Sequence, residues 1–238
     1  MNVQRVSKTE INESFLQSTL EESGIERHEL PENLTEALII YIARVSSSRD
    51  NKWEDYTGLI NFLVREGHWS PFEHAFITYE IETSRAIGRQ LIRHRSFTFQ
   101  EFSQRYAEAR TFEDVELRGQ PEQNRQSSSE PVNPDVPNPI NQIEMNSADR
   151  VVDATLEMIR SIYNNLLSAG VASETARMIL PECTQTTIYM TGSLRSWIHF
   201  LDLRLSENSQ KEIRLIGQDI AEDLSSEFPH VAKARGFK

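Results

Sequence analysis

The order of hydrophobic and polar positions predicts two helices early in the chain. Asn33 lies three residues before Glu36, the spacing of a capping box, and the apolar segment LTEALIIYIARVS follows directly. This segment predicts a mostly buried helix that ends before residues 46–50. A second helix is predicted over about Trp53 to Glu66, because aliphatic residues recur at helical spacing there, and Gly67 suits its C-terminal cap.

The period changes from helix to strand in the segment HWSPFEHAFITYEIET. Apolar and polar residues alternate from Ile77 to Glu82, which is typical of a half-buried strand after a proline-containing turn. Ser84 can cap the next helix, SRAIGRQLIRHR. Arg85, Arg89 and Arg93 are each four residues apart, so they share one face of that predicted helix.

The second half of the chain begins with a proline-rich segment. Residues 119–146 hold five of the nine prolines and few large apolar residues, which predicts a long surface loop or insertion. The pattern then predicts a long amphipathic helix over about 149–168, a short helix from Ser173 to Pro181, a strand over TQTTIYMT, a helix capped by Ser193, and a final helix from Ser206 to about Ser225. We therefore expect one domain over 33–228, an irregular or partly helical extension over 1–32, and a C-terminal tail over 229–238.

Composition places the chain among ordinary globular proteins. Of 238 residues, 38% are hydrophobic and 26% charged, and no apolar run approaches the ~20 residues of a membrane-spanning helix. The N-terminus lacks the apolar stretch of a secretory signal. The single cysteine, Cys183, cannot form an intramolecular disulfide, which fits a reducing compartment. We expect a cytoplasmic protein.

The charge distribution is uneven. The sum of 25 basic and 36 acidic residues is −11, which makes the chain a poor general binder of nucleic acid or anionic membrane. Between Arg85 and Arg110, however, six arginines and two glutamates give a local charge of +4. Because arginine suits bidentate recognition of phosphates and carboxylates, this segment predicts a local site for an anionic ligand.

Several familiar sites are excluded by missing motifs. The sequence contains no GxGxxG, no GxxxxGK[ST], no GxSxG and no HExxH. His68, Glu73 and His74 match no standard zinc spacing, so we expect no metal site. No neighbouring histidine supports Cys183 as a nucleophile, and a buried inert thiol is the favoured interpretation.

The most informative segment is RHRSFTFQEFSQRY, residues 93–106. Three consecutive side chains from Arg93 to Arg95 cannot all share one helix face, so part of this triplet is expected to leave the helix and project into a cleft. Seven residues separate the triplet from Ser103-Gln104-Arg105, and this pattern resembles the RHRx7SxR signature of the flavin-dependent thymidylate synthases. The resemblance extends to ARVS, GHWSPFEH, ETARMILP and LRSWIHFLDLR, in the order found in that family.

The resemblance implies the reductive methylation of dUMP to dTMP. Methylenetetrahydrofolate would supply the one-carbon unit, and FAD, reduced by NADPH, would supply the hydride. The family does not use an enzyme thiol to activate uracil, which agrees with a chain that has no cysteine motif. A fixed guanidinium can instead stabilise negative charge on the N3/O4 edge of uracil without losing its own proton.

The resemblance also implies roles for individual residues. Arg204 resembles the residue that activates uracil, Ser103 a substrate-positioning hydroxyl, and His68 the histidine near the flavin ring. The implied substrate-binding residues are Gln90, Leu91, Ile92, Arg93, Glu101, Phe102, Ser103, Gln104, Arg105, Arg177 and Arg204. The implied FAD-binding residues are Ser70, Arg93, His94, Arg95, Ser96, Glu101, Ser193, Leu194, Arg195 and His199.

The expected fold is an α/β protein of the α+β type, a single domain in which helices pack on a curled, largely antiparallel sheet. The resemblance implies a homotetramer with FAD sites between subunits. One alternative is a non-catalytic nucleotide-binding or regulatory protein of the same fold, because Ser193 and His199 stand where some family members have asparagine. Another is a nucleic-acid-binding domain that uses the cationic segment, which the overall charge disfavours.

Overall fold

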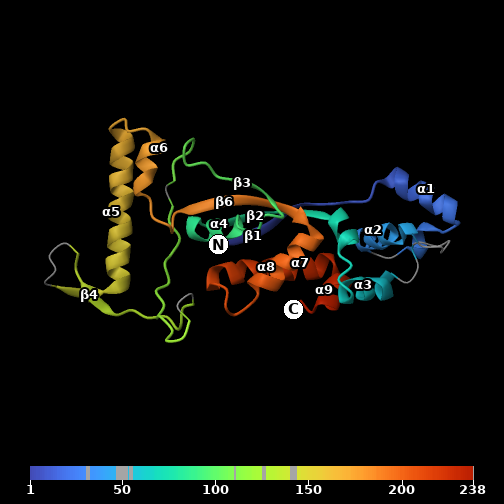
Figure 1. Cartoon of the computed structure of the whole chain (residues 1–238). Helices are drawn as coiled ribbons and strands as arrows, with labels where there is room; N and C mark the ends of the chain where they lie inside the picture. Colours follow the sequence, from blue (N-terminus) through green and yellow to red (C-terminus); the bar gives the residue numbers. More distant parts are fainter. Residues whose placement is uncertain are drawn as a thin grey trace.

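The structure, a computed structural model, describes residues 1–30, 33–46, 53, 56–109, 111–124, 127–139 and 144–237. Its centre is an antiparallel sheet with the strand order β1-β2-β6-β3 (Figure 1). These strands are β1 (Asn2–Lys8), β2 (Phe76–Ser84), β3 (Thr98–Glu101) and β6 (Gln185–Ser193). The mixture of helices with an open antiparallel sheet in a single domain confirms the predicted fold class.

Helices surround the sheet on one side and at both ends. They are α1 (Glu13–Ser23), α2 (Leu34–Ala43), α3 (Tyr56–Arg65), α4 (Arg85–Leu91), α5 (Ala148–Ser168), α6 (Ser173–Ala176), α7 (Leu194–Arg204), α8 (Lys211–Glu227) and α9 (Pro229–Arg235). Short 3-10 helices are η1 (Arg27–Glu29), η2 (Arg44–Ser46), η3 (Ser70–His74) and η4 (Arg177–Ile179). Helices α7 and α8 lie beneath the sheet, whereas α5 and α6 stand apart at one end (Figure 1). Among the described residues, no helix has the length and apolar character needed to cross a bilayer.

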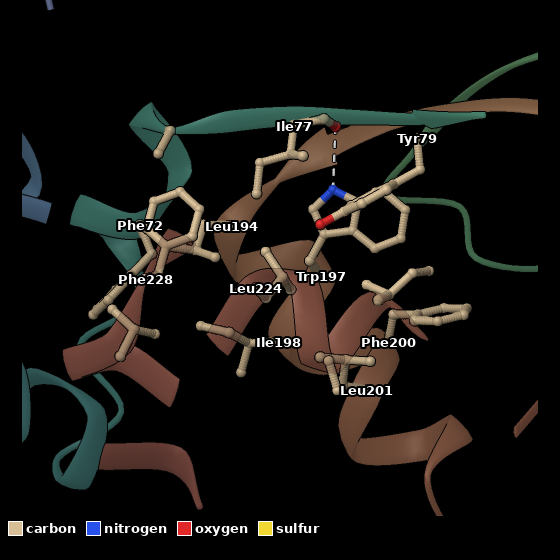
Figure 2. Packing of buried hydrophobic residues seen from close by; sticks show 14 of the residues in the cluster. Phe72, Ile77, Tyr79, Leu194, Trp197, Ile198, Phe200, Leu201, Leu224 and Phe228 are labelled. Carbon is tan, nitrogen blue, oxygen red and sulfur yellow. Dashed lines mark hydrogen bonds between the residues drawn. The ribbon is translucent and has the colours of Figure 1, made fainter. Parts of the chain in front are cut away.

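The core fixes α7 against the sheet. Trp197 of α7 packs edge-on against Tyr79 of β2, with 4.9 Å between ring centroids, and donates its indole N–H to the carbonyl oxygen of Ile77 at 3.2 Å (Figure 2). Phe200 and Leu201 on the same face are fully buried. Because this face of α7 is packed into the core, Arg195 and His199 on the other face are held at the surface.

The predicted helix caps are confirmed. Asn33 accepts the backbone N–H of Glu36 at 3.0 Å, which begins α2. Ser84 and Ser193 likewise cap α4 and α7 through their hydroxyl oxygens. The second helix is also confirmed, as α3, although residues 54 and 55 near its predicted start lie outside the described residues.

Three boundary predictions are wrong. Residues 2–8, assigned to an irregular or partly helical extension, form an edge strand paired with β2, whereas α1 and the short η1 in that region are helical. The final helix does not start at Ser206, because α8 begins at Lys211 after Gln210. The segment assigned to a C-terminal tail contains another helix, α9, with Pro229 in its first turn.

The cationic helix and the proline-rich segment differ in detail from the prediction. Helix α4 ends at Leu91, so Arg93 leaves the helix and does not share its face with Arg85 and Arg89. The proline-rich segment runs largely without regular structure, but β4 (Asp135–Pro137) pairs there with β5 (Met145–Ser147). Arg110, at the end of the cationic segment, lies outside the described residues.

Candidate active site

The centre of the candidate site is a contact between His94 and Arg204. His94 lies in the turn after α4, and Arg204 is the last residue of α7. The Nε of Arg204 donates a hydrogen bond to Nε2 of His94 at 2.9 Å. The His94 ring also packs edge-on against Phe200, with 4.8 Å between centroids. Two residues that the sequence places in one site, 110 positions apart, are therefore in direct contact.

The electrostatics of this pair keep His94 neutral. Burial lowers the pKa of His94 to about 4, and the nearby charges of Arg204 and His199 act in the same direction. A neutral ring accepts the hydrogen bond from Arg204 at an unprotonated Nε2, so the ring's own proton is on Nδ1. Burial also lowers the pKa of Arg204, yet an arginine stays charged at neutral pH. The contact thus holds a charged guanidinium in one orientation, and none of the carboxylates that the structure describes forms an ion pair with it.

A pocket of about 410 Å³ lies on the exposed side of α7. It contains three of the residues predicted to bind FAD, namely Ser96, Arg195 and His199. The other lining residues are Trp69, Ser196, Ile198, Asp202 and Arg235. The pocket therefore combines two guanidinium groups with hydroxyl, imidazole, aromatic and aliphatic side chains, which suits a ligand with both charged and ring-shaped parts.

Glu73 organises the start of α7 beside this pocket. One carboxylate oxygen of Glu73 accepts the hydroxyl of Ser193 at 2.5 Å, and the other accepts Nη1 of Arg195 at 2.5 Å. Burial by itself would raise the pKa of Glu73, but the hydrogen bonds from Ser193 and Arg195 and the charges of Arg195 and His74 outweigh it and lower the pKa. Glu73 thus stays ionised and fixes Arg195. No group of three or more metal-ligating side chains is present among the described residues.

Two further predicted residues, Arg105 and Arg177, lie together at a different place. Nη2 of Arg105 bonds to the carboxylate of Glu174 at 3.3 Å, and Nε of Arg177 donates to the backbone oxygen of Glu174 at 3.3 Å. Both guanidinium groups are close to α6, at the end of the molecule where α5 stands (Figure 1). Between described residues, no hydrogen bond or ion pair connects this pair with Arg204.

The remaining cationic side chains separate into two kinds. Arg85 and Arg89 are occupied in ion pairs with Glu101 at 3.1 Å and Glu182 at 2.6 Å. Arg93 and Arg95 are exposed, and neither side chain forms a hydrogen bond or ion pair with any described residue. These two guanidinium groups of the RHR triplet are therefore available to a ligand.

Other predicted site residues have structural partners within the chain. Glu101 accepts hydrogen bonds from Arg85 and from Thr186 at 3.0 Å, and Gln90 donates to Gln210 at 2.6 Å. Leu91 and Leu194 belong to the buried core, so only their backbones can reach a ligand. The rest are placed as follows: Ile92, Phe102 and Ser103 are exposed or partly exposed, Ser70 begins η3, His68 packs against Phe62, and Gln104 is buried with its Nε2 unpaired.

Comparison with known proteins identifies the family. A family model described as "Thymidylate synthase complementing protein" matches residues 30–230. The chain is also 43% identical over 199 residues to a flavin-dependent thymidylate synthase of Synechocystis sp., and this match covers 84% of the chain and 88% of that relative. The chain belongs to the family of flavin-dependent thymidylate synthases. As a member of that family it is an enzyme of the methyltransferase class.

Further similarities support this membership. The probable flavin-dependent thymidylate synthase of Paramecium bursaria Chlorella virus 1 is 42% identical over 205 residues, which cover 85% of this chain and 91% of the viral one. The fold resembles that of a UMP/dUMP methylase, PolB from Streptomyces cacaoi, bound with 5-Br UMP, at a TM-score of 0.71 and 24% identity, with 98% and 92% of the two chains covered. At that identity the likeness concerns the fold alone.

The structure adds site residues to those that the sequence predicts, namely Glu73, Trp69, Ser196, Ile198, Asp202 and Arg235. From the sequence Glu73 is only a disfavoured metal ligand, whereas in the structure it binds Ser193 and Arg195. Asp202 and Arg235 line the pocket and are not considered in the sequence analysis. For Glu73, the family-like segment GHWSPFEH is the available sequence signal, but the partners of Glu73 lie 120 and 122 positions away.

Proposed function

We propose that the protein catalyses the FAD-dependent reductive methylation of dUMP to dTMP, with methylenetetrahydrofolate as one-carbon donor and NADPH as reductant. The observation that carries the proposal is the Arg204 guanidinium, oriented by the neutral His94 ring at the end of α7. The names of the relatives, flavin-dependent thymidylate synthases, support a flavin cofactor and thymidylate as the product.

The residues present fit a flavin dinucleotide. The pocket that contains Ser96, Arg195 and His199 offers guanidinium donors for phosphate and apolar side chains for a ring. Arg95 follows His94 directly and has no ion-pair partner among the described residues. The bound flavin would supply the hydride that completes the methyl group. The chain would hold it through Arg195, which Glu73 keeps in place.

The protein's own contribution to the chemistry is electrostatic. Arg204 would lie against the N3/O4 edge of the pyrimidine and stabilise the negative charge that makes C5 nucleophilic. His94 would leave that charge undiminished, because a neutral ring accepts the Arg204 hydrogen bond where a carboxylate would neutralise the cation. Arg93, in the turn just after α4, is exposed and would extend the contacts to the same ligand.

A homotetramer would complete the nucleotide site. Arg105 and Arg177, suited to the dUMP phosphate, lie away from Arg204 within one chain, so we propose that they come from a neighbouring subunit. The neighbouring helix α5 supports this assembly. Over its 21 residues only Ala148 and Tyr163 are buried, while Met158 is 50% exposed. A helix with such an uncovered apolar face suits an interface between copies.

The test of the function begins with the purified wild-type protein. It should carry, or take up, a yellow flavin chromophore and convert dUMP to dTMP when methylenetetrahydrofolate and NADPH are supplied. Flavin binding and dUMP binding without any turnover would favour the alternative, a non-catalytic nucleotide-binding protein. A protein that binds neither flavin nor dUMP would refute both.

The shared site has a separate test by complementation. Arg105→Ala and Arg204→Ala should each be inactive, because each removes one half of every site. Mixed and reassembled, the two variants should regain about a quarter of wild-type activity, since random exchange leaves that share of sites with both arginines. Arg27→Ala, which breaks an exposed ion pair with Glu13, is the matched control and should stay active throughout. If the mixture stays inactive although subunits exchange, the site is not shared in this way.

A further inference from the structure

The C-terminal helix α9 contributes an arginine to the wall of the candidate flavin pocket. Arg235, the last residue of α9, lines the same 410 Å³ pocket as Arg195 and His199. Its Nε and Nη2 donate to the two carboxylate oxygens of Asp202 on α7, at 2.9 and 2.6 Å. This two-point ion pair fixes the plane of the guanidinium group.

Helix α9 is anchored at its other end too, so Arg235 is not part of a loose terminus. Glu36 of α2 is fully buried and accepts the backbone N–H groups of His230 and Val231, each at 3.0 Å. A carboxylate at this position satisfies N–H groups that have no partner within the helix. Val231 and Ala232 pack into the core. The position of Arg235 at the pocket is thus built into the fold.

The geometry of the ion pair leaves one edge of Arg235 for a ligand. A guanidinium has five N–H groups, and Asp202 engages Nε and Nη2, so the two N–H groups of Nη1 have no bonded partner among the described residues. Arg195 is arranged similarly, since Glu73 engages only its Nη1. Two guanidinium groups therefore line one pocket, Arg235 held by Asp202 at two nitrogens and Arg195 held by Glu73 at one.

We propose that Arg235 is a cofactor-binding residue that, together with Arg195, recognises the diphosphate of the flavin dinucleotide, and that Asp202 is its positioning residue. The inference rests on the proposed function, because it assigns this pocket to that cofactor. A diphosphate is the ligand group that two guanidinium donors at one pocket match best, as each can donate two hydrogen bonds to phosphate oxygens. Riboflavin, which has the ring system without phosphate, lacks this contact.

The experiment measures binding of FAD and riboflavin to the flavin-free protein by quenching of flavin fluorescence. Arg235→Gln should weaken FAD binding about tenfold or more, the effect of losing a charged hydrogen-bond donor, and leave riboflavin binding unchanged. Asp202→Asn retains the cation of Arg235 but loses its carboxylate anchor, so it should weaken FAD binding by about threefold, less than Arg235→Gln, and leave riboflavin binding unchanged. Arg27→Gln, which removes an arginine from an exposed two-point pair with Glu13, is the control and should bind both flavins normally.

Two results would overturn the inference. One is an unchanged FAD dissociation constant in Arg235→Gln. The other is an equal loss of FAD and riboflavin binding in both Arg235→Gln and Asp202→Asn, which would mean that the ion pair only docks α9. Neither result affects the proposed function as long as the wild-type protein binds FAD. If the wild type binds no flavin at all, the proposed function fails first.

Discussion

Replacing His94 by glutamine should change how the stability of the protein depends on pH. The pKa of His94 is lowered to about 4 in the folded protein, from 6.5 for a free histidine, mainly by burial. Between these two pH values the unfolded chain binds a proton that the folded chain does not. The folded state therefore loses stability as the pH falls from 6.5 towards 4, and above 6.5 the effect is absent. Glutamine does not titrate, so the variant lacks this part of the pH dependence.

The size of the effect follows from the shift. A change from 6.5 to about 4 corresponds to about 3 kcal/mol if the ring is fully shielded from water. The His94 ring is only partly buried, and solvent screening reduces the expected effect to about 1–2 kcal/mol. A protonated ring could no longer accept the hydrogen bond from Arg204, so this loss of stability should accompany the loss of that contact.

The assay is urea unfolding of the flavin-free protein from pH 7 to pH 4, at one protein concentration for all variants. The difference in unfolding free energy between wild type and His94→Gln should shrink by about 1–2 kcal/mol over this range. Other acid-sensitive groups are common to both proteins and cancel in the difference. The control His28→Gln, which replaces an exposed histidine of η1, should follow the wild-type curve. A wild-type-to-variant difference that stays constant across the range would refute the reasoning.

Three further substitutions test the site and the core. Arg204→Lys keeps the charge but loses the planar fork, so dTMP formation should fall about 10²-fold while flavin is retained, and unchanged turnover would remove Arg204 from the activating role. Glu73→Gln releases Arg195, so the protein should be purified with less flavin, and a full complement of flavin would contradict that role. Gly192→Ala places a Cβ against the ring of Phe97, closer than normal contact, and should destabilise the fold by about 1–3 kcal/mol. A variant with the urea midpoint of the wild type would contradict this expectation.

Sequence periodicity predicted the elements whose burial repeats regularly along the chain. Strand β2 and helix α7 have clear alternating or helical patterns, and both appear where the sequence predicts them. Strand β1 was missed because it lies at the sheet edge and exposes most of its side chains. Its register is supported by ion pairs that no local pattern reveals, such as Arg5 with Asp223 at 3.1 Å and Lys8 with Glu227 at 2.5 Å.

Helix α9 was missed for a related reason. Seven residues are too few for a strong helical period, and isolated helices of that length are not stable in water. The group that satisfies its first N–H groups is Glu36, which is 194 positions from His230 in the sequence. Resemblance to the family could not supply Arg235 either, because the motifs that carry the resemblance end at Arg204. Strand β1 and helix α9 are therefore both stabilised by contacts between segments that are distant in the sequence.

The acidic character of the chain and its arginine-rich site together favour small anionic ligands over large ones. A net charge of −11 disfavours long polyanions, while the site keeps guanidinium groups for small anionic ligands. The carboxylates beside these guanidinium groups do not prevent them from binding such ligands. Asp202 binds one edge of Arg235 and Glu73 binds one nitrogen of Arg195, which lowers the conformational entropy lost when a ligand binds the remaining N–H groups. Arg204 differs, since the group that orients it is the uncharged ring of His94, and among the described residues no carboxylate is bonded to it.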